Sequence, residues 1–312
     1  MLTQHYKQDK VLVVVPTTSL VYQMKTDFES YNCKEAIHTI MSGKEKTTDD
    51  RIVISTWQSI YKMDPNYFDQ FDVVIGDEAH LYKAKSLTKI MEKLINTKYR
   101  FGFTGTLDGS QTHKLVLEGL FGPVYQPVTT KKLIDDKHLA DFLIKCITLK
   151  YPQDICKIVK DMKYQDEIDF ITTYEPRNKF ISRVCEAQEG NTLVLFHLID
   201  HGKTIHDLIL TRKDKDRKLF FVYGGTDAET REQIRAIAET EDNSIIVASF
   251  GTFSTGVNIR NLHNIIFASP SKSKIRNLQS IGRGLRKSQT KEKARLIAVS
   301  YTHLRAHETK AN

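Results

Sequence analysis

The chain has 312 residues, enough for two domains at about 100 to 200 residues each, so either domain can bury its own core. A composition that is 40% hydrophobic and 27% charged, with 15 Gly and 7 Pro, excludes collagens, coiled coils and low-complexity chains. The formal net charge of +8 is unevenly distributed, because residues 1–127 are neutral and residues 128–312 carry the whole excess.

The sequence predicts no membrane segment. The longest apolar run, Val11 to Val15, is far shorter than the roughly 20 residues of a membrane span, and the N-terminus lacks the basic-then-apolar pattern of a signal peptide. We therefore expect a cytoplasmic protein. The four cysteines form no CxxC pair, so we interpret them as core thiols rather than zinc ligands (Cys33, Cys146, Cys156, Cys185).

The predicted elements alternate between short apolar runs and helical patterns, which is typical of parallel sheets covered by helices. The first half contains a predicted helix over 19–30 and predicted strands at 11–16, 51–57, 71–80 and 98–106. Residues 128–185 interrupt this alternation, and we interpret them as a linker and insertion with a strand at 145–152 and an acidic helix near 164–173. The alternation then restarts, with strands predicted at 191–197, 218–225, 244–250, 263–269 and 294–300. The fold class is therefore α/β, with two parallel-sheet domains in tandem at 1–127 and 186–298.

Basic residues concentrate in the segment from Arg260 to Arg295, which contains ten Lys or Arg and one acid, Glu292. Such a concentration favours a phosphate-bearing partner. On charge alone, a solvated basic face is the competing interpretation.

The strongest chemical signal is the run Asp77-Glu78-Ala79-His80 after a buried strand. Ligands of open parallel sheets bind at the carboxyl ends of strands, so two adjacent acids there point into a crevice. An Asp in this position can hold a hydrated Mg²⁺ that bridges nucleotide phosphates, and the next Glu can orient the attacking water. For an isolated pair of acids, a capped turn would be the simpler explanation.

Further motifs accompany these acids in a fixed order. They are Pro16-Thr17-Thr18-Ser19-Leu20, Ser55-Thr56-Trp57-Gln58, Thr104-Gly105-Thr106, Tyr223-Gly224-Gly225-Thr226, Phe253-Ser254-Thr255-Gly256-Val257-Asn258 and Gln279-Ser280-Ile281-Gly282-Arg283-Gly284-Leu285-Arg286. Together they resemble the superfamily 2 helicases and translocases, motif by motif, to about residue 298. The resemblance implies two RecA-like domains, the first incomplete, with ATP and Mg²⁺ bound in a cleft between them.

The resemblance also implies roles for individual residues. Gln279, Arg283 and Arg286 fall at i, i+4 and i+7, one face of a helix, so two guanidinium groups can act together as arginine fingers. The catalytic set implied is Asp77, also the metal ligand, with Glu78, Gln279, Arg283 and Arg286. The cofactor-binding set implied is His80, Thr104, Thr106, Gly256 and Asn258, with Thr104 and Thr106 coupling the ATP and nucleic-acid sites.

Hydroxyl-rich loops at strand ends suit hydrogen bonding to a nucleic-acid backbone, which carries no sequence information. We therefore expect non-specific, salt-sensitive binding. The nucleic-acid-binding set implied by the resemblance is Pro16, Thr17, Thr18, Thr56, Trp57, His197, Thr226, Ser249 and Thr252.

The likeness is strongest to phage helicases of this superfamily, especially in PTTSL, FGFTGT, FGPVYQPVTTKKL, HGKTIHDLI and FSTGVNIRNLHNIIFA. It implies an ATP-dependent DNA helicase that remodels branched or single-stranded DNA, or RNA in R-loops, during phage recombination and replication. It further implies a monomer in the cytoplasm of an infected bacterium. Two other function classes stay open: a restriction or repair translocase subunit, and a non-catalytic nucleic-acid-binding fragment.

The phosphate-binding loop GxxxxGK[ST] is the family motif that this sequence lacks, because only ten residues precede Val11. Ser42-Gly43-Lys44-Glu45 lacks the final hydroxyl residue, and Gly202-Lys203-Thr204 has His197 in place of the first glycine. We expect the chain to be truncated at its N-terminus and impaired in hydrolysis. Residues 299–312 are interpreted as a non-native tail, and His197, His201 and His206 as loop histidines rather than a metal site.

Overall fold

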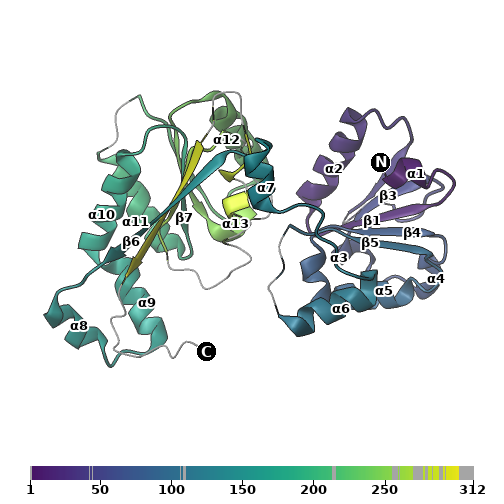
Figure 1. Cartoon of the computed structure of the whole chain (residues 1–312), viewed down its shortest axis with the longest axis horizontal. Coiled ribbons are helices and arrows are strands. Elements are labelled where there is room, and N and C mark those ends of the chain that lie inside the picture. The colour runs from purple at the N-terminus through teal and green to yellow at the C-terminus, as the bar shows by residue number, and fades with distance from the viewer. Residues whose placement is uncertain are drawn as a thin grey trace. The chain divides into compact units, whose positions relative to one another are not determined.

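The computed structural model describes residues 2–41, 43, 45–105, 107, 110–212, 216–254, 259, 261–269, 277, 280–282, 284–287, 291 and 293–301. The chain divides into two compact units, Met1–Pro127 and Val128–Asn312, and each contains its own parallel sheet (Figure 1). Among the residues just given, no helix has the length and apolar character needed to cross a bilayer.

The first unit is a five-stranded parallel sheet in the order β2-β3-β1-β4-β5. Its strands are β1 (Val11–Val15), β2 (Ile37–Ile40), β3 (Ile52–Thr56), β4 (Val73–Gly76) and β5 (Tyr99–Gly102). Every residue of β1 is buried, as expected for a central parallel strand covered on both faces.

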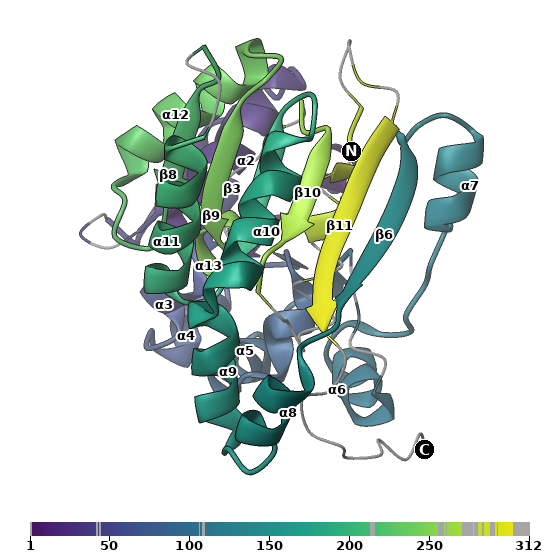
Figure 2. The ribbon, with the colours of Figure 1, turned by 90° about the vertical axis from the view of Figure 1, so that its left-hand side faces the viewer.

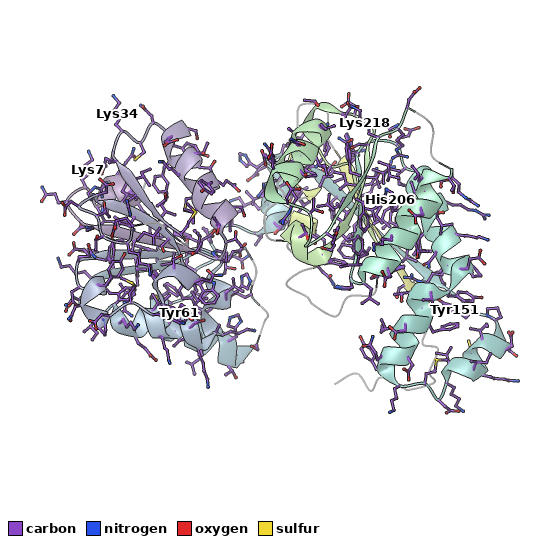
Figure 3. All side chains as sticks on the ribbon, turned by 180° about the vertical axis from the view of Figure 1, so that it is seen from behind. Lys7, Lys34, Tyr61, Tyr151, His206 and Lys218 are labelled. Atoms are coloured by element: carbon purple, nitrogen blue, oxygen red, sulfur yellow. The ribbon has the colours of Figure 1, made fainter. Side chains whose placement is uncertain are left out.

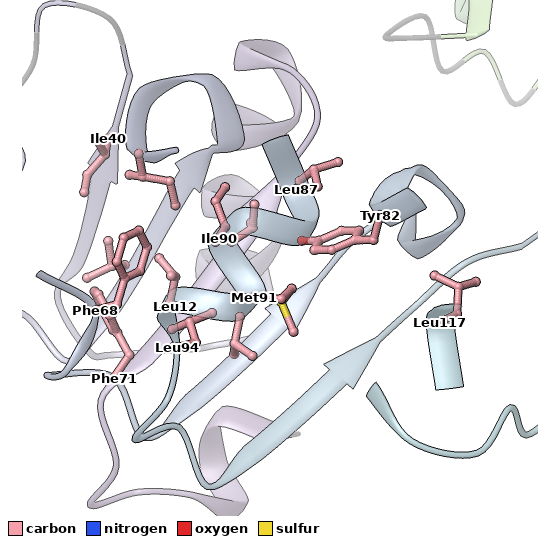
Figure 4. Close-up of a cluster of buried hydrophobic side chains, with 14 residues drawn as sticks. Leu12, Ile40, Phe68, Phe71, Tyr82, Leu87, Ile90, Met91, Leu94 and Leu117 are labelled. Atoms are coloured by element: carbon pink, nitrogen blue, oxygen red, sulfur yellow. The ribbon is translucent and has the colours of Figure 1, made fainter. Parts of the chain in front are cut away.

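Successive residues of β1 pack into two different cores, because side chains alternate between the faces of a sheet. Val11 and Val13 pack with α1 (Leu2–His5) and α2 (Thr18–Ser30). Leu12 and Val14 face the larger core shown in Figure 4. That core also receives α3 (Trp57–Ile60), α4 (Pro65–Phe68), α5 (Lys85–Lys93), α6 (Gln111–Phe121) and the 3₁₀ helix η1 (Ala79–Lys83).

The second unit is a six-stranded parallel sheet in the order β6-β11-β10-β7-β9-β8 (Figure 2). The strands are β6 (Asp141–Leu149), β7 (Thr192–Phe196), β8 (Leu219–Val222), β9 (Ile245–Ser249), β10 (Asn264–Phe267) and β11 (Lys293–Tyr301). Helices α10 (Glu175–Glu186) and α11 (Ile199–Leu210) pack on one face, and α12 (Ala228–Thr240) and α13 (Phe250–Ser254) pack on the other. Helices α7 (Thr130–Asp135), α8 (Gln153–Val159) and α9 (Tyr164–Thr173) complete this unit.

The prediction of two α/β parallel sheets is confirmed, and three local features differ from what the sequence indicated. The edge strand β2 was not predicted, because its four residues, Ile-His-Thr-Ile, are half polar and mostly half-buried. Residues 128–185 do more than link and insert, since they supply β6, which pairs with β11 along nine residues. The predicted tail begins inside the sheet: Val299, 3% exposed, and Tyr301 belong to β11 and pair with Ile147 and Leu149.

Candidate functional site

The acidic run forms a sharp turn at the carboxyl end of β4. Strand β4 ends at Gly76, and the Asp77 backbone N–H still donates to the carbonyl of Val14 on β1 at 3.0 Å. Glu78 then adopts a left-handed conformation, with φ 49° and ψ 51°, before η1 begins. This conformation is unfavourable for a residue with a Cβ and is concentrated at functional sites, so the turn is a strained part of the edge.

Asp77 is suited to a cation. Burial raises the pKa of its carboxyl, and the backbone N–H of Glu78, at 2.9 Å from Oδ1, partly opposes that shift. A carboxylate whose charge is disfavoured in this way gains most from a nearby positive ion. No group of three or more His, Cys, Asp or Glu in the described part of the chain could hold a metal. A single carboxylate fits Mg²⁺, which commonly takes its remaining ligands from substrate phosphates and water.

His80 joins the acidic turn to the end of β5. Its Nδ1 lies 3.0 Å from Thr104 Oγ1 and 3.2 Å from Glu78 Oε2, and the side chain is almost fully buried. Two predicted site residues from separate motifs, His80 and Thr104, therefore meet directly. A shift in the position of Thr104 would act on the same ring that contacts Glu78.

His113, on α6, is a site residue that sequence reasoning missed. Its Nε2 lies 2.9 Å from the carbonyl oxygen of His80, and the residue is 4% exposed. Because a carbonyl oxygen only accepts, His113 Nε2 carries the hydrogen. A lone histidine within an ordinary helical pattern gives no sequence signal for this contact.

Close packing behind the acidic turn requires a glycine at position 76. A Cβ built there would lie 2.7 Å from the Tyr82 hydroxyl oxygen and 3.0 Å from the Phe121 ring. The two rings contact each other edge to face, with centroids 5.0 Å apart. Burial and the charge of Asp77 raise the pKa of Tyr82. The glycine thus allows the Tyr82 and Phe121 rings to pack directly against the backbone that precedes the acidic turn.

The predicted nucleic-acid residues of the first unit lie at the same carboxyl edge. They follow β1 and β3, which are neighbours, and Gln58 Nε2 donates to the carbonyl of Pro16 at 3.2 Å. The Thr17 hydroxyl caps α2 by accepting from Leu20, and the hydroxyls of Thr56 and Ser59 lie 2.9 Å apart. Thr18 is exposed, whereas Thr56 is 5% exposed. Trp57 is half-buried at the start of α3.

Four predicted residues of the second unit also follow neighbouring strands, β7, β9 and β8. His197 is exposed, and its ring stacks on Phe250 with centroids 4.5 Å apart. The Ser249 and Thr252 hydroxyls lie 2.7 Å apart, and Thr252 is 5% exposed. The Thr226 hydroxyl accepts the backbone N–H of Tyr223 at 3.1 Å. The polar groups at this edge therefore bond mainly to one another.

A buried polar network beneath the second edge was also not predicted. His201 Nδ1 lies 3.0 Å from the Ser269 hydroxyl, and its Nε2 lies 3.1 Å from Asn178 Oδ1 and 3.5 Å from Arg177 Nη1. Ser269 Oγ in turn accepts the backbone N–H of His197 at 3.2 Å. Burial and Arg177 lower the pKa of His201 to about 3, so it is neutral at ordinary pH. The network fixes the ends of β7 and β10 relative to α10 and α11.

The interpretation of His197, His201 and His206 as loop histidines is wrong for two of them, because His201 and His206 lie within α11. The same helix contains Gly202, where a built Cβ would lie 2.5 Å from the Phe196 ring. Gly202 therefore permits close packing of the helix on β7. Its place inside a helix agrees with the rejection of Gly202-Lys203-Thr204 as a phosphate-binding loop.

Several predicted residues lie outside the described part of the chain: Thr106, Gly256, Asn258, Gln279 and Arg283. Arg286 is described and exposed, and it lies two residues after Gly284, the last described helical residue of its segment. Lys291 Nζ donates to the carbonyl of Gly284 at 2.7 Å and caps the helix there. The arrangement of Gln279, Arg283 and Arg286 on one helix face stays a prediction, because two of the three residues lie outside the described part of the chain.

Comparison with known proteins agrees with this geometry. Residues 1–109 match the family described as type III restriction enzyme, res subunit, and residues 176–288 match the helicase conserved C-terminal domain. Over 303 residues the chain is 37% identical to the ATP-dependent DNA helicase uvsW of Enterobacteria phage T4. That alignment covers 93% of this chain and 60% of the relative, so the chain spans about three fifths of the relative's length.

Two solved structures share the fold at low identity. The ATP-dependent Type ISP restriction-modification enzyme LlaBIII bound to DNA gives a TM-score of 0.69 at 16% identity, covering 96% of this chain and 25% of that one. The Hef helicase domain of Pyrococcus furiosus gives 0.57 at 11% identity, covering 95% and 87%. The two sheets are thus RecA-like domains of the helicase type. Because residues 1–109 match the res-subunit model, residues 176–288 match the helicase C-terminal model, and 93% of this chain aligns with the T4 helicase at 37% identity, this chain belongs to the superfamily 2 helicases.

Proposed function

We propose that this chain is the motor portion of an ATP-dependent DNA helicase or translocase. Its substrates are branched or single-stranded DNA and the RNA–DNA hybrids of R-loops, bound without sequence specificity, in phage recombination and replication. The setting is the cytoplasm of an infected bacterium, and the motor acts as a monomer. The phage helicase relative and the two RecA-like units support this proposal.

One observation carries the proposal: the strained acidic turn at the carboxyl edge of the first sheet, linked through His80 to Thr104. A buried Asp beside a Glu in a left-handed turn is costly for stability alone. The same arrangement is useful for phosphoryl transfer, which depends on positioning and charge stabilisation rather than on covalent chemistry.

In the proposed ATP hydrolysis each of the site residues has its own role. Asp77 would hold Mg²⁺, and the bound ion would supply positive charge against the nucleotide phosphates. Glu78 accepts a proton from, and orients, the attacking water. His80 fixes the Glu78 carboxylate on one side and Thr104 on the other. Gln279, Arg283 and Arg286 of the second unit stabilise the transferring phosphoryl group, and Gly256 and Asn258 contact the nucleotide.

Coupling to DNA follows from the shared edge. The loops after β1 and β3 contact the nucleic-acid backbone through Thr18 and Trp57, and β4 and β5 carry the hydrolytic residues on neighbouring strands. A displacement of the first pair of loops is transmitted to the turn through hydrogen bonds between β1 and β4, one of them made by Asp77 itself.

The test is DNA-stimulated ATPase activity, measured for this chain and for a form extended at its N-terminus toward the length of the T4 relative. We expect stimulated hydrolysis in the extended form and its loss, by at least about 100-fold, in Glu78→Gln. Glu29→Gln, an exposed acid on α2, serves as the matched control and should retain activity. Absence of DNA-stimulated hydrolysis in the extended wild type would refute the motor and favour a non-catalytic binding fragment.

A further inference from the structure

A basic groove lies on the first unit, lined by residues of α5 and of the segment between α3 and α4. Its volume is about 630 Å³, and it is lined by Tyr61, Lys62, Pro65, Lys85, Ser86, Lys89, Glu92, Lys93 and Ile95. Four of these nine residues are lysines and one is an acid. No predicted site residue lines it.

Three of the groove lysines are available for an anion. Lys62, Lys85 and Lys89 are exposed, and within the described part of the chain they form no ion pair. Lys85 and Lys89 are four residues apart on α5, so they project from the same helix face about 6 Å apart along its axis. Lys62, in the segment between α3 and α4, lines the same groove.

Hydrogen bonds hold other segments that line the groove in place. Lys93 Nζ donates to the carbonyls of Tyr61 and Met63, at 2.9 and 2.6 Å, and lies 5.7 Å from the Phe68 ring centroid. These bonds fix the chain between α3 and α4 against α5. Lys62 Nζ lies 5.5 Å from the ring centroid of Tyr61, so positive charge and an aromatic face form one surface.

The groove continues the edge where nucleic acid is proposed to bind. Tyr61 is one helical turn after Trp57, and their rings are in edge contact with centroids 5.8 Å apart. A strand contacting Thr18 and Trp57 therefore meets Tyr61 next. Cationic grooves with aromatic platforms are the surfaces that bind single strands without sequence preference.

We propose that this groove binds single-stranded nucleic acid, with phosphates paired to Lys62, Lys85 and Lys89 and a base stacked on Tyr61. The inference rests on the proposed function, because it extends the footprint of the same motor from the sheet edge onto α5. It gives the first unit, neutral overall, a local site for a polyanion.

The test compares two triple variants of the full chain that remove the same charge: Lys62→Gln/Lys85→Gln/Lys89→Gln in the groove, and Lys7→Gln/Lys25→Gln/Lys34→Gln as the control. The control lysines belong to or flank the α1 and α2 side of the sheet, and Figure 3 shows Lys7 and Lys34 at the end of the unit opposite Tyr61. Affinity for a fluorescein-labelled oligothymidylate is measured by anisotropy between about 50 and 200 mM NaCl.

We expect the groove variant to bind about 10- to 100-fold more weakly at low salt and to lose about 2 from the slope of log affinity against log salt. The control should stay within about threefold of wild type. Tyr61→Leu should weaken binding about 5- to 100-fold, and Tyr31→Leu, which alters an 82% exposed tyrosine, should not. Circular dichroism of every variant separates loss of binding from loss of fold.

Equal affinities for the groove and control variants would overturn the groove while leaving the motor intact. Failure of wild type to bind the oligonucleotide would refute the proposed function itself. A third outcome is that wild type binds a polyglutamate peptide more tightly than the groove variant does, while both bind the oligonucleotide equally. The groove would then bind an acidic protein segment, and the inference would be wrong.

Discussion

The two RecA-like units share a plan but treat their carboxyl edges differently. In the first unit the edge carries a half-buried carboxyl, Asp77, and a left-handed non-glycine residue, Glu78. In the second unit the hydroxyls of Ser249, Thr252 and Thr226 bond within the edge, and His201 and Ser269 form a buried network. The first edge retains an unfavourable backbone conformation and a carboxyl whose charge is disfavoured, as catalytic sites do, whereas the polar groups described at the second edge bond to one another.

The largest stability effect is expected in the second unit. His201→Leu removes the buried ring that the Ser269 hydroxyl and Asn178 Oδ1 contact, and should destabilise that unit by about 2 to 4 kcal/mol. His206→Leu, on the same helix, loses a contact with the exposed Asp207 and keeps an apolar group against the Phe221 ring, so it should cost less than about 1 kcal/mol. Urea unfolding with hydrogen exchange of β7 and β10 measures both. Equal costs would mean that the network does not stabilise the edge.

The same network gives a pH signature. The pKa of His201 is about 3 in the folded state, below its ordinary value of 6.5, so the unfolded chain binds more protons between these values. Its contribution to stability is therefore complete above about pH 6.5 and is lost as the pH falls toward 3. His201→Leu should remove this part of the acid sensitivity, and an unchanged pH profile would contradict the assignment.

The next largest effect on stability is expected where Tyr82 and Phe121 pack against Gly76 in the first unit. Gly76→Ala places a Cβ against the Tyr82 hydroxyl and should destabilise the first unit by about 1 to 3 kcal/mol. Gly119→Ala, in α6 with open space around it, should instead stabilise by about 0.5 to 1 kcal/mol. Hydrogen exchange of β1 and β4 reports on this unit, and a neutral Gly76→Ala would show that the aromatic support is adaptable.

Relieving the left-handed conformation of Glu78 should change stability less, and in the stabilising direction. Glu78→Gly removes the unfavourable left-handed Cβ and should raise the free energy of unfolding by up to about 1 kcal/mol. Glu78→Gln keeps the Cβ and serves as the control, with no such gain. Both variants should lose hydrolysis in the extended form. A Glu78→Gly variant less stable than Glu78→Gln would show that the backbone there is not strained.

The smallest effect concerns the charge on Asp77. Burial raises its pKa, so the folded state binds its proton more tightly than the unfolded chain and stability declines as the pH rises through the folded-state pKa. Asp77→Asn keeps an acceptor for the Glu78 N–H and should be more stable than wild type at neutral pH, with the difference shrinking in acid. Thermal unfolding across this range is the measurement, and a difference independent of pH would refute the cause.

The sequence by itself determined which segments form buried strands and which polar residues follow them. Apolar runs such as Val11–Val15 predicted buried parallel strands because few other settings bury five consecutive apolar residues, and residues after such strands had to share one edge. That edge geometry predicted a site at Asp77, and the resemblance to superfamily 2 helicases added His80 and Thr104, whose side chains lie 3.0 Å apart. The edge strand β2 was not predicted, and β6 (Asp141–Leu149) was predicted with shifted bounds, at 145–152, since both strands are only partly buried and lack the continuous apolar signal.

Only the tertiary structure decided which groups touch. His113 reaches the His80 carbonyl from α6, 33 residues away in sequence, and Arg177 reaches His201 from a different helix. The carbonyl of Gly284, at the end of a helical segment, accepts from the amine of Lys291, seven residues further along the chain. Periodicity reports the face on which a residue lies, but not the partner that approaches it, because that partner is set by how helices pack on the sheet.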